Sequence, residues 1–220
     1  MKKLAIIFSL IFVMILGLRA TVMAQDEIQA RITMYKYVSS TGESYSIKFE
    51  IFGQELKNVN KVSINVPSRR RLLVHNNLEF DGIQFSKDSM SYAEFRKRFP
   101  EGEYEINLTP RRYGRFKMGM AYNFPNPVIT SPADGATDVP LNPTIRWEPL
   151  NNVNSLSLKA ISANHTFSTD LPVDATSFTA GYDYLEPNTQ YDLSLEATTI
   201  DFKGNALVST YTISFTTIAK

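Results

Sequence analysis

The segment YLEPNTQYDLSLEA, residues 184–197, decides the fold of the second half of this chain. Pro187 and Asn188 are typical of a tight turn, and apolar and polar residues alternate from Tyr191 onward, which predicts a half-buried β-strand. We expect Leu185 to close the bottom of a core and the ring of Tyr191 to be buried, with a partner for its hydroxyl. Such a hydrogen bond contributes about 0.5–1.5 kcal/mol, so its main effect is to set where the strand begins.

The pattern L-x-P-x-T-x-Y within this segment resembles the turn into strand F of fibronectin type III domains, where the tyrosine forms a tyrosine corner. TIRWEP, with Trp147, looks like strand B with its core tryptophan, and SFTT, residues 214–217, looks like the end of strand G. SPADGATDVPLNPTI and TIDFKGNALVSTYTISFTT are similar to bacterial Ig-like domains, in which a D-x-x-G-N loop joins the last two strands. The resemblance covers residues 127–217 and implies a β-sandwich, but such domains serve many functions.

The first residues predict a signal peptide. Lys2 and Lys3 precede a run of mostly apolar residues from Leu4 to Leu18, and Val22 and Ala24 stand at the spacing of a cleavage site. The apolar run falls short of the roughly 20 residues of a membrane-spanning helix. We therefore expect residues 1–24 to be removed, and the mature chain to be secreted or periplasmic with no transmembrane anchor.

The chain contains no cysteine, so it has no disulfide, no thiol nucleophile and no lipid-modified N-terminal cysteine. The segment NFPNPVITSPADG, with three prolines, reads as a stiff extended link. It predicts domains over residues 25–124 and 125–220, which carry net charges of +4 and −6.

In the first half, alternation predicts strands over residues 28–34, 45–51, 62–66, 104–108 and 116–124, with weaker ones over 72–74 and 78–85. SMSYAEFRKRFPEG predicts a short helix with Ser91 and Glu94 as a capping box. FPEGEYEINL repeats the pattern of LEPNTQYDLSL, so we predict a second Ig-like sandwich here.

The second half predicts strands over residues 145–147, 156–161, 166–168, 177–179, 191–199 and 209–216. The predicted fold class is all-β: two tandem Ig-like or fibronectin type III-like β-sandwich domains after a cleaved signal peptide, with one short helix in the first domain.

Catalytic patterns are weak. The two histidines, His75 and His165, fall in different predicted domains, and no nucleophile elbow or zinc motif occurs. Loop aspartates at 134, 138 and 201 lack a calcium-loop spacing, so Asp201 is expected to cap a turn. Alternating glutamates at 101, 103 and 105 read as solvated strand charges. We therefore predict no enzyme, no metal and no cofactor.

Basic clusters are the clearest candidates for contacts: RRR at 69–71, RKR at 96–98 and RRYGR at 111–115. In an Ig-like order the first two face the second domain, whose facing loops carry acidic residues. We predict an interdomain contact among the following residues: Arg69, Arg70, Arg71, Arg96, Lys97, Arg98, Asp170, Asp174 and Asp201. The third cluster lies at a free hairpin tip, and its residues Arg111, Arg112, Tyr113 and Arg115 are the predicted external contact.

These observations favour a non-enzymatic binding, adhesion or scaffold protein of the bacterial envelope with an envelope or extracellular protein partner. The alternative is an accessory carbohydrate-binding protein or a non-catalytic subunit of a secreted hydrolase system, with an acidic or neutral polysaccharide as ligand. Tyrosines 35, 37, 113, 182 and 184 would supply its stacking surfaces. A nucleic-acid ligand is not expected for an exported chain of near-neutral charge.

Overall fold

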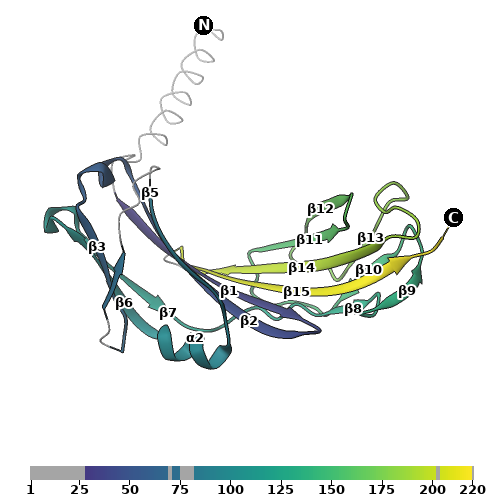
Figure 1. Cartoon of the computed structure of the whole chain (residues 1–220), viewed down its shortest axis with the longest axis horizontal. Helices are drawn as coiled ribbons and strands as arrows, with labels where there is room; N and C mark the ends of the chain where they lie inside the picture. The colour runs from purple at the N-terminus through teal and green to yellow at the C-terminus, as the bar shows by residue number, and fades with distance from the viewer. Residues whose placement is uncertain (1–27, 69–70, 75–81, 202–203, 220) are drawn as a thin grey trace, which may run out of the picture.

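The computed structural model describes residues 28–68, 71–74, 82–201 and 204–219 (Figure 1). The chain is all-β with a single short α-helix within these residues, as predicted. The strands of the first half are β1 (Gln29–Ser39), β2 (Gly42–Phe52), β3 (Lys61–Asn65), β4 (Arg71–Val74), β5 (Gly82–Met90), β6 (Gly102–Thr109) and β7 (Arg115–Met120). The short helices are η1 (Gln54–Asn58), α2 (Tyr92–Arg98) and η2 (Arg111–Tyr113).

The first half packs two sheets face to face. Strands β1, β2 and β5 pair in that order, and β4, β3, β6 and β7 form the opposing sheet. Ile32 and Phe49 of the first sheet share one buried cluster with Ile64 and Ile106 of the second. The alternation of apolar residues in these strands produces this core, because successive side chains of a strand point to opposite faces.

Helix α2 begins and packs as its sequence predicts. The Ser91 hydroxyl accepts a hydrogen bond from the Glu94 backbone N–H at 3.3 Å, which caps the first turn. Phe95 and Phe99 are fully buried, and the ring of Phe95 lies 5.4 Å from that of Tyr45 on β2. The helix is thus anchored on the first core by its aromatic face.

The strands of the second half are β8 (Ile129–Ser131), β9 (Ala136–Val139), β10 (Thr144–Trp147), β11 (Ser155–Ile161), β12 (Thr166–Leu171), β13 (Ser177–Thr179), β14 (Gln190–Ile200) and β15 (Ala206–Thr217). Strands β13, β10 and β8 form one sheet, and β12, β11, β14 and β15 pair in a second. A separate buried cluster lies between them and includes Trp147, Tyr191 and Leu193.

Three features of this fold were not predicted from the sequence. Strand β8 falls within the proline-rich segment, for which the sequence predicts a link, and β9 begins directly after that segment. Strand β5 continues to Met90, whereas the sequence predicts a strand that ends at residue 85; the predicted residues 78–81 lie outside the described part. The third feature is the pairing of β1 with β15, which joins the two halves.

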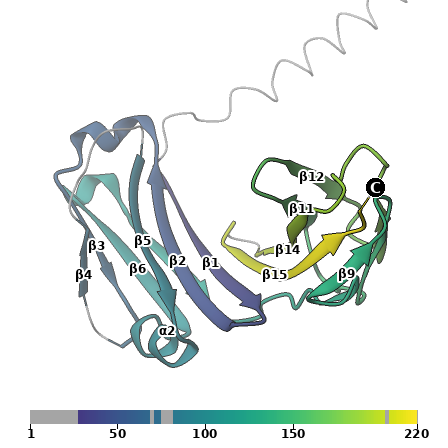
Figure 2. The same cartoon turned by 45° about the vertical axis from the view of Figure 1, so that its right-hand side comes forward.

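Strand β1 pairs with β15 in parallel, so one sheet runs through both halves of the molecule. The register matches Thr33 with Ala206 and continues to Val38 with Tyr211. The complete order is β12-β11-β14-β15-β1-β2-β5, and β9 pairs with the far end of β15 to make eight strands. Figure 2 shows β1 and β15 side by side between the two halves. The halves are therefore joined by main-chain pairing as well as by the proline-rich link.

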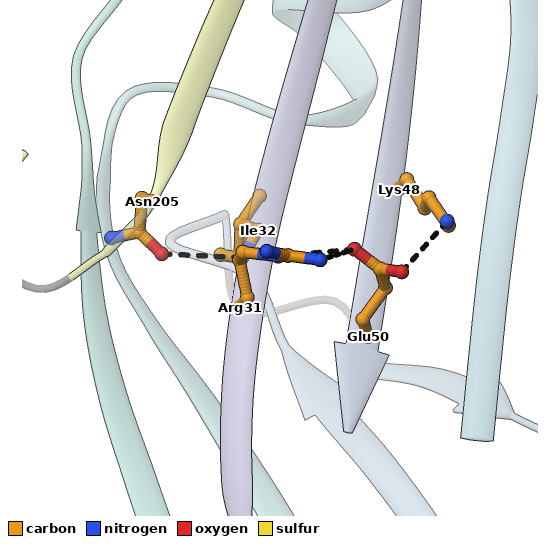
Figure 3. A network of polar contacts seen from close by, with 5 residues as sticks. All are labelled: Arg31, Ile32, Lys48, Glu50 and Asn205. Carbon is orange, nitrogen blue, oxygen red and sulfur yellow. Dashed lines mark hydrogen bonds and ion pairs between the residues drawn. The ribbon is translucent and has the colours of Figure 1, made fainter. Parts of the chain in front are cut away.

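A polar network continues this pairing at the Thr33–Ala206 end, one residue before the first matched pair (Figure 3). The side-chain carbonyl of Asn205 accepts a hydrogen bond from the Ile32 backbone N–H at 3.2 Å. On the other side of β1, Arg31 donates to Glu50 at 2.8 Å, and the Lys48 ammonium lies 2.7 Å from the same carboxylate. Burial raises the pKa of Glu50, but hydrogen bonds from Lys48 and Arg31 outweigh burial and lower the pKa below its ordinary value.

Asn205 belongs to the turn between β14 and β15. The Asp201 carboxylate accepts hydrogen bonds from the Asn205 backbone N–H and side-chain amide, both at 2.9 Å. Gly204 donates to the Asp201 carbonyl at 3.0 Å and has φ +81°, a left-handed conformation that favours glycine. The D-x-x-G-N pattern thus builds a turn that holds the Asn205 amide against β1.

Candidate functional site

A groove of about 620 Å³ lies on the outer face of the sheet formed by β4, β3, β6 and β7. Its lining is mostly polar and includes three arginines and one carboxylate. The lining residues are Asn65, Arg71, Glu105, Asn107, Leu108, Thr109, Arg111, Gly114 and Arg115. These residues come from β3, β4, β6, η2 and β7, so strand pairing positions most of the groove.

Cross-strand pairing explains why these side chains meet. Asn65 on β3 lies opposite Arg71 on β4 and opposite Glu105 on β6. Two residues after Glu105 on β6, Asn107 lies opposite Arg115 on β7. Directly opposed residues on a sheet face are close enough for their side chains to interact. The polar positions of the alternating strands therefore form a continuous patch.

Glu105 is held in place at the centre of this patch. Asn107 and Asn65 donate side-chain hydrogen bonds to one carboxylate oxygen at 2.9 and 3.2 Å, and Arg115 lies 3.4 Å from the other. The hydrogen bond from Asn107, followed by the charge of Arg115, lowers the pKa of Glu105 below its ordinary value. The carboxylate is charged at neutral pH and is already partnered.

Arg71 and Arg111 border the groove and leave it with an excess of positive charge. Arg71 donates to the Ser63 hydroxyl at 3.0 Å, which orients its guanidinium along the sheet face. Arg111 begins the short helix η2, and Gly114, the residue that follows the helix, has φ +108°. With Arg115, the groove has three guanidinium groups and a single carboxylate. A guanidinium can bind a carboxylate or a phosphate through two parallel hydrogen bonds.

The structure divides the predicted hairpin-tip contact into two pairs. Arg111 and Arg115 line the groove, whereas Arg112 and Tyr113 interact with each other. Arg112 donates to the Tyr113 hydroxyl at 2.7 Å, and its guanidinium carbon lies 4.8 Å from the ring centroid. The sequence grouped all four by proximity in the chain, but it did not connect them with Arg71, which strand pairing brings to the same face.

The residues predicted to orient the two domains lie in several places. Arg69 and Arg70 are outside the described residues, and Arg71 lines the groove. The helix cations at 96–98 include Arg96, 5.5 Å from the Tyr92 ring, and Arg98, 3.3 Å from Glu94. Lys97 is exposed.

On the acidic side, Asp174 is exposed, Asp170 lies on β12, and Asp201 shapes the turn at the β1–β15 junction. A role for these charges in domain orientation stays a prediction.

The predicted structural residues Leu185, Pro187, Tyr191 and Trp147 lie in and around the second core. Tyr191 and Leu185 are buried, and the Tyr191 hydroxyl accepts a hydrogen bond from the Glu186 backbone N–H at 2.9 Å. The carbonyl of Pro187 accepts from the Thr189 hydroxyl at 2.9 Å. Trp147 is buried and its indole N–H donates to the Ala175 carbonyl at 2.8 Å.

The first half contains a matching arrangement, in which the buried Tyr104 donates its hydroxyl proton to the Pro100 carbonyl at 2.7 Å. Each tyrosine thus joins the first part of its strand, β6 or β14, to the backbone of the turn before it, as the repeated sequence pattern suggests.

Two further facts concern metal binding and membrane spanning. Within the described residues, no group of three or more histidine, aspartate or glutamate side chains is arranged to hold a metal ion. No helix in the described part of the chain is long and apolar enough to cross a membrane.

Comparison with known proteins gives the class of the second half. The family model of the bacterial Ig-like domain matches residues 124–217, which confirms the resemblance predicted for residues 127–217. No curated protein matches the chain.

Many solved structures are similar to the chain, and three of them serve as examples. One is a two-domain fibronectin type III segment of chicken tenascin, with 11% identity over 79% of this chain and 93% of that one, and a TM-score of 0.32. A second contains domains FN1–FN3 of chicken CNTN1, with 12% identity over 88% of this chain and 65% of that one, and a TM-score of 0.31. A third is a bacterial ice-binding adhesin, with 13% identity over 87% of this chain and 66% of that one, and a TM-score of 0.29.

Proposed function

We propose that this protein is an exported, non-enzymatic binding protein of the bacterial surface that acts in adhesion or as a scaffold. In this proposal residues 1–24 are a signal peptide, and residues 25–124 and 125–220 are two Ig-like or fibronectin type III-like sandwich domains. The family match over residues 124–217 and the two separate buried clusters support it. An intact mass of the exported chain that begins at Gln25 would support the proposed cleavage site.

The observation that carries the proposal is the excess of guanidinium groups in the groove. Arg71 and Arg115 lie on paired strands and Arg111 on the adjoining helix η2, while the carboxylate of Glu105 is already paired. Rigid strands position binding groups more precisely than loops do. We therefore propose that the groove binds acidic groups of an envelope or extracellular partner protein.

A binding experiment with isolated bacterial envelope tests this function. The mature chain is expected to bind the envelope saturably, and the double variant Arg71→Glu with Arg115→Glu to lose at least tenfold in affinity. Arg146→Glu makes the same type of charge change on an exposed position of β10 and is the matched control. Absence of envelope binding argues against the function, and binding that survives the double variant argues against the groove.

The charge contrast between the halves supports a further proposal, that the basic and acidic clusters help orient them. Exposed ion pairs contribute only about 0–1 kcal/mol each, so the expected effect is on alignment. Small-angle scattering at low and high salt measures it. An arrangement that is insensitive to salt and to Arg96→Glu with Arg98→Glu would speak against this role.

A further inference from the structure

A second groove, of about 540 Å³, lies on the eight-stranded sheet and draws its lining from both halves. Tyr37 on β1 comes from the first half, and residues of β11, β12, β14 and β15 complete the lining. The other ten lining residues belong to the second half, and the pairing of β1 with β15 adds Tyr37 to them.

The groove lies on the face of the sheet opposite the two cores. Leu207 packs against the first cluster, whereas Tyr211 and Ile213, which point to the same side of β15, pack in the second. The other side of β15 carries Thr210, which lies opposite Tyr37. Both cores are therefore on one side of β15, and the groove is on the other.

One row of paired residues crosses the groove over five strands. Tyr37 lies opposite Thr210, Thr210 opposite Glu196, Glu196 opposite Ser157, and Ser157 opposite Asp170. With strands about 4.8 Å apart, the four steps extend over roughly 19 Å, the length of a short oligosaccharide. The row presents an aromatic ring at one end and hydroxyl and carboxylate groups along the rest.

Tyr37 is held in an orientation suited to stacking. It is 41% exposed, and its ring lies parallel to that of Tyr35, with 6.0 Å between centroids and 5° between planes. The neighbouring ring restricts the rotation of Tyr37 and lowers the entropy lost when a ligand packs on it. A pyranose ring has an apolar C–H face that packs on an aromatic ring, and its hydroxyls need nearby donors and acceptors.

The charges of this groove distinguish it from the arginine groove. Its ionisable lining groups are Lys159, Asp170 and Glu196, so its net charge is negative. The Glu196 carboxylate lies 3.5 Å from the Thr210 hydroxyl, and Ser157, Ser168 and Ser194 provide further hydroxyls. An acidic polysaccharide would be repelled, whereas the hydroxyl pairs of a neutral sugar can hydrogen-bond to the carboxylates.

We propose that this junction groove binds a neutral oligosaccharide, stacked on Tyr37 and hydrogen-bonded to Glu196 and Asp170. The site is independent of the proposed arginine groove and takes a different class of ligand. It also gives a specific basis to the alternative function, that of an accessory carbohydrate-binding protein.

Isothermal titration of the mature chain with cellohexaose, laminarihexaose, mannohexaose and chitohexaose tests this site. At least one of these neutral sugars is expected to bind saturably, and Tyr37→Ala to weaken binding at least tenfold. Tyr182→Ala is the matched control, because Tyr182 is 71% exposed and does not line the groove. Glu196→Gln is expected to weaken binding without removing the aromatic ring, and circular dichroism checks that each variant is folded.

The outcomes separate the two sites. Binding of a neutral sugar that is lost in Tyr37→Ala and retained in both Tyr182→Ala and Arg71→Glu supports the proposal. The proposal is overturned if none of the four sugars binds, if Tyr37→Ala binds normally, or if Tyr182→Ala loses as much affinity. If only the acidic sugar hexagalacturonate binds, the proposal is also overturned, because an acidic ligand is expected to bind the arginine groove.

Discussion

Replacing Asn205 by alanine tests whether the junction stabilises the fold. Ile32 is 1% exposed, and its backbone N–H bonds to the Asn205 side chain at 3.2 Å. The variant leaves this buried N–H without a partner, which costs about 1–3 kcal/mol. It also removes the amide hydrogen bond to Asp201 at 2.9 Å, worth about 0.5–1.5 kcal/mol. We expect the free energy of unfolding to fall by about 2–3 kcal/mol, allowing for partial replacement by water.

Urea unfolding measures this change. Trp147 is the only tryptophan and lies in the second core, so its fluorescence reports on the half that carries Asn205. Asn154→Ala is the matched control, because the Asn154 side chain accepts a hydrogen bond from the Ile200 N–H at 2.7 Å in an exposed position. Its expected cost is below about 1 kcal/mol. The reasoning is refuted if Asn205→Ala costs less than about 0.5 kcal/mol or no more than the control.

Three further predictions concern the first half. Tyr104→Phe removes the hydrogen bond to the Pro100 carbonyl and is expected to lower the free energy of unfolding by about 0.5–1.5 kcal/mol in urea titrations; a change near zero would contradict the assigned role. Ser91→Ala removes the helix cap and is expected to cost about 1 kcal/mol, whereas Ser91→Asp, which can also cap, should retain most of the stability. Burial, followed by the charge of Glu101, raises the pKa of Tyr122 to about 12, from 10.0. The associated stability is full below pH 10 and is lost as the pH rises towards 12; ultraviolet titration of the phenolate signal, with Tyr122→Phe as reference, checks it.

Local sequence patterns predicted most strands and the helix because their causes are local. The alternation of apolar and polar residues shows which side of a strand is buried. The Ser91 side chain caps the first turn of the helix by accepting a hydrogen bond from Glu94, three residues away. The corner tyrosines Tyr104 and Tyr191 bond to backbone only four and five residues away. Strands β8 and β9 were not predicted because they are three and four residues long and lie among prolines, where alternation gives little signal.

The two grooves could not be predicted because they depend on partners distant in the sequence. Arg71 and Arg115 meet on one face through the pairing of β4, β3 and β6 with β7. The β1–β15 register joins Tyr37 to Thr210 across most of the chain. The alternation of apolar and polar residues in a strand predicts which of its residues share a face. It does not predict which other strand pairs with that strand. The D-x-x-G-N pattern predicted the loop between the last two strands, but not the hydrogen bond of Asn205 to β1.

The pairing of β1 with β15 also constrains the order in which the molecule can assemble. Ile32 and Asn205 are 173 positions apart, so the edge of β1 that faces β15 stays uncovered until β15, the last strand of the described residues, is available for pairing. Contacts this distant form slowly, and an uncovered strand edge can pair with another chain. Before β15 pairs with it, this edge of β1 is therefore expected to favour self-association, and a chaperone that shields β1 would act at that stage.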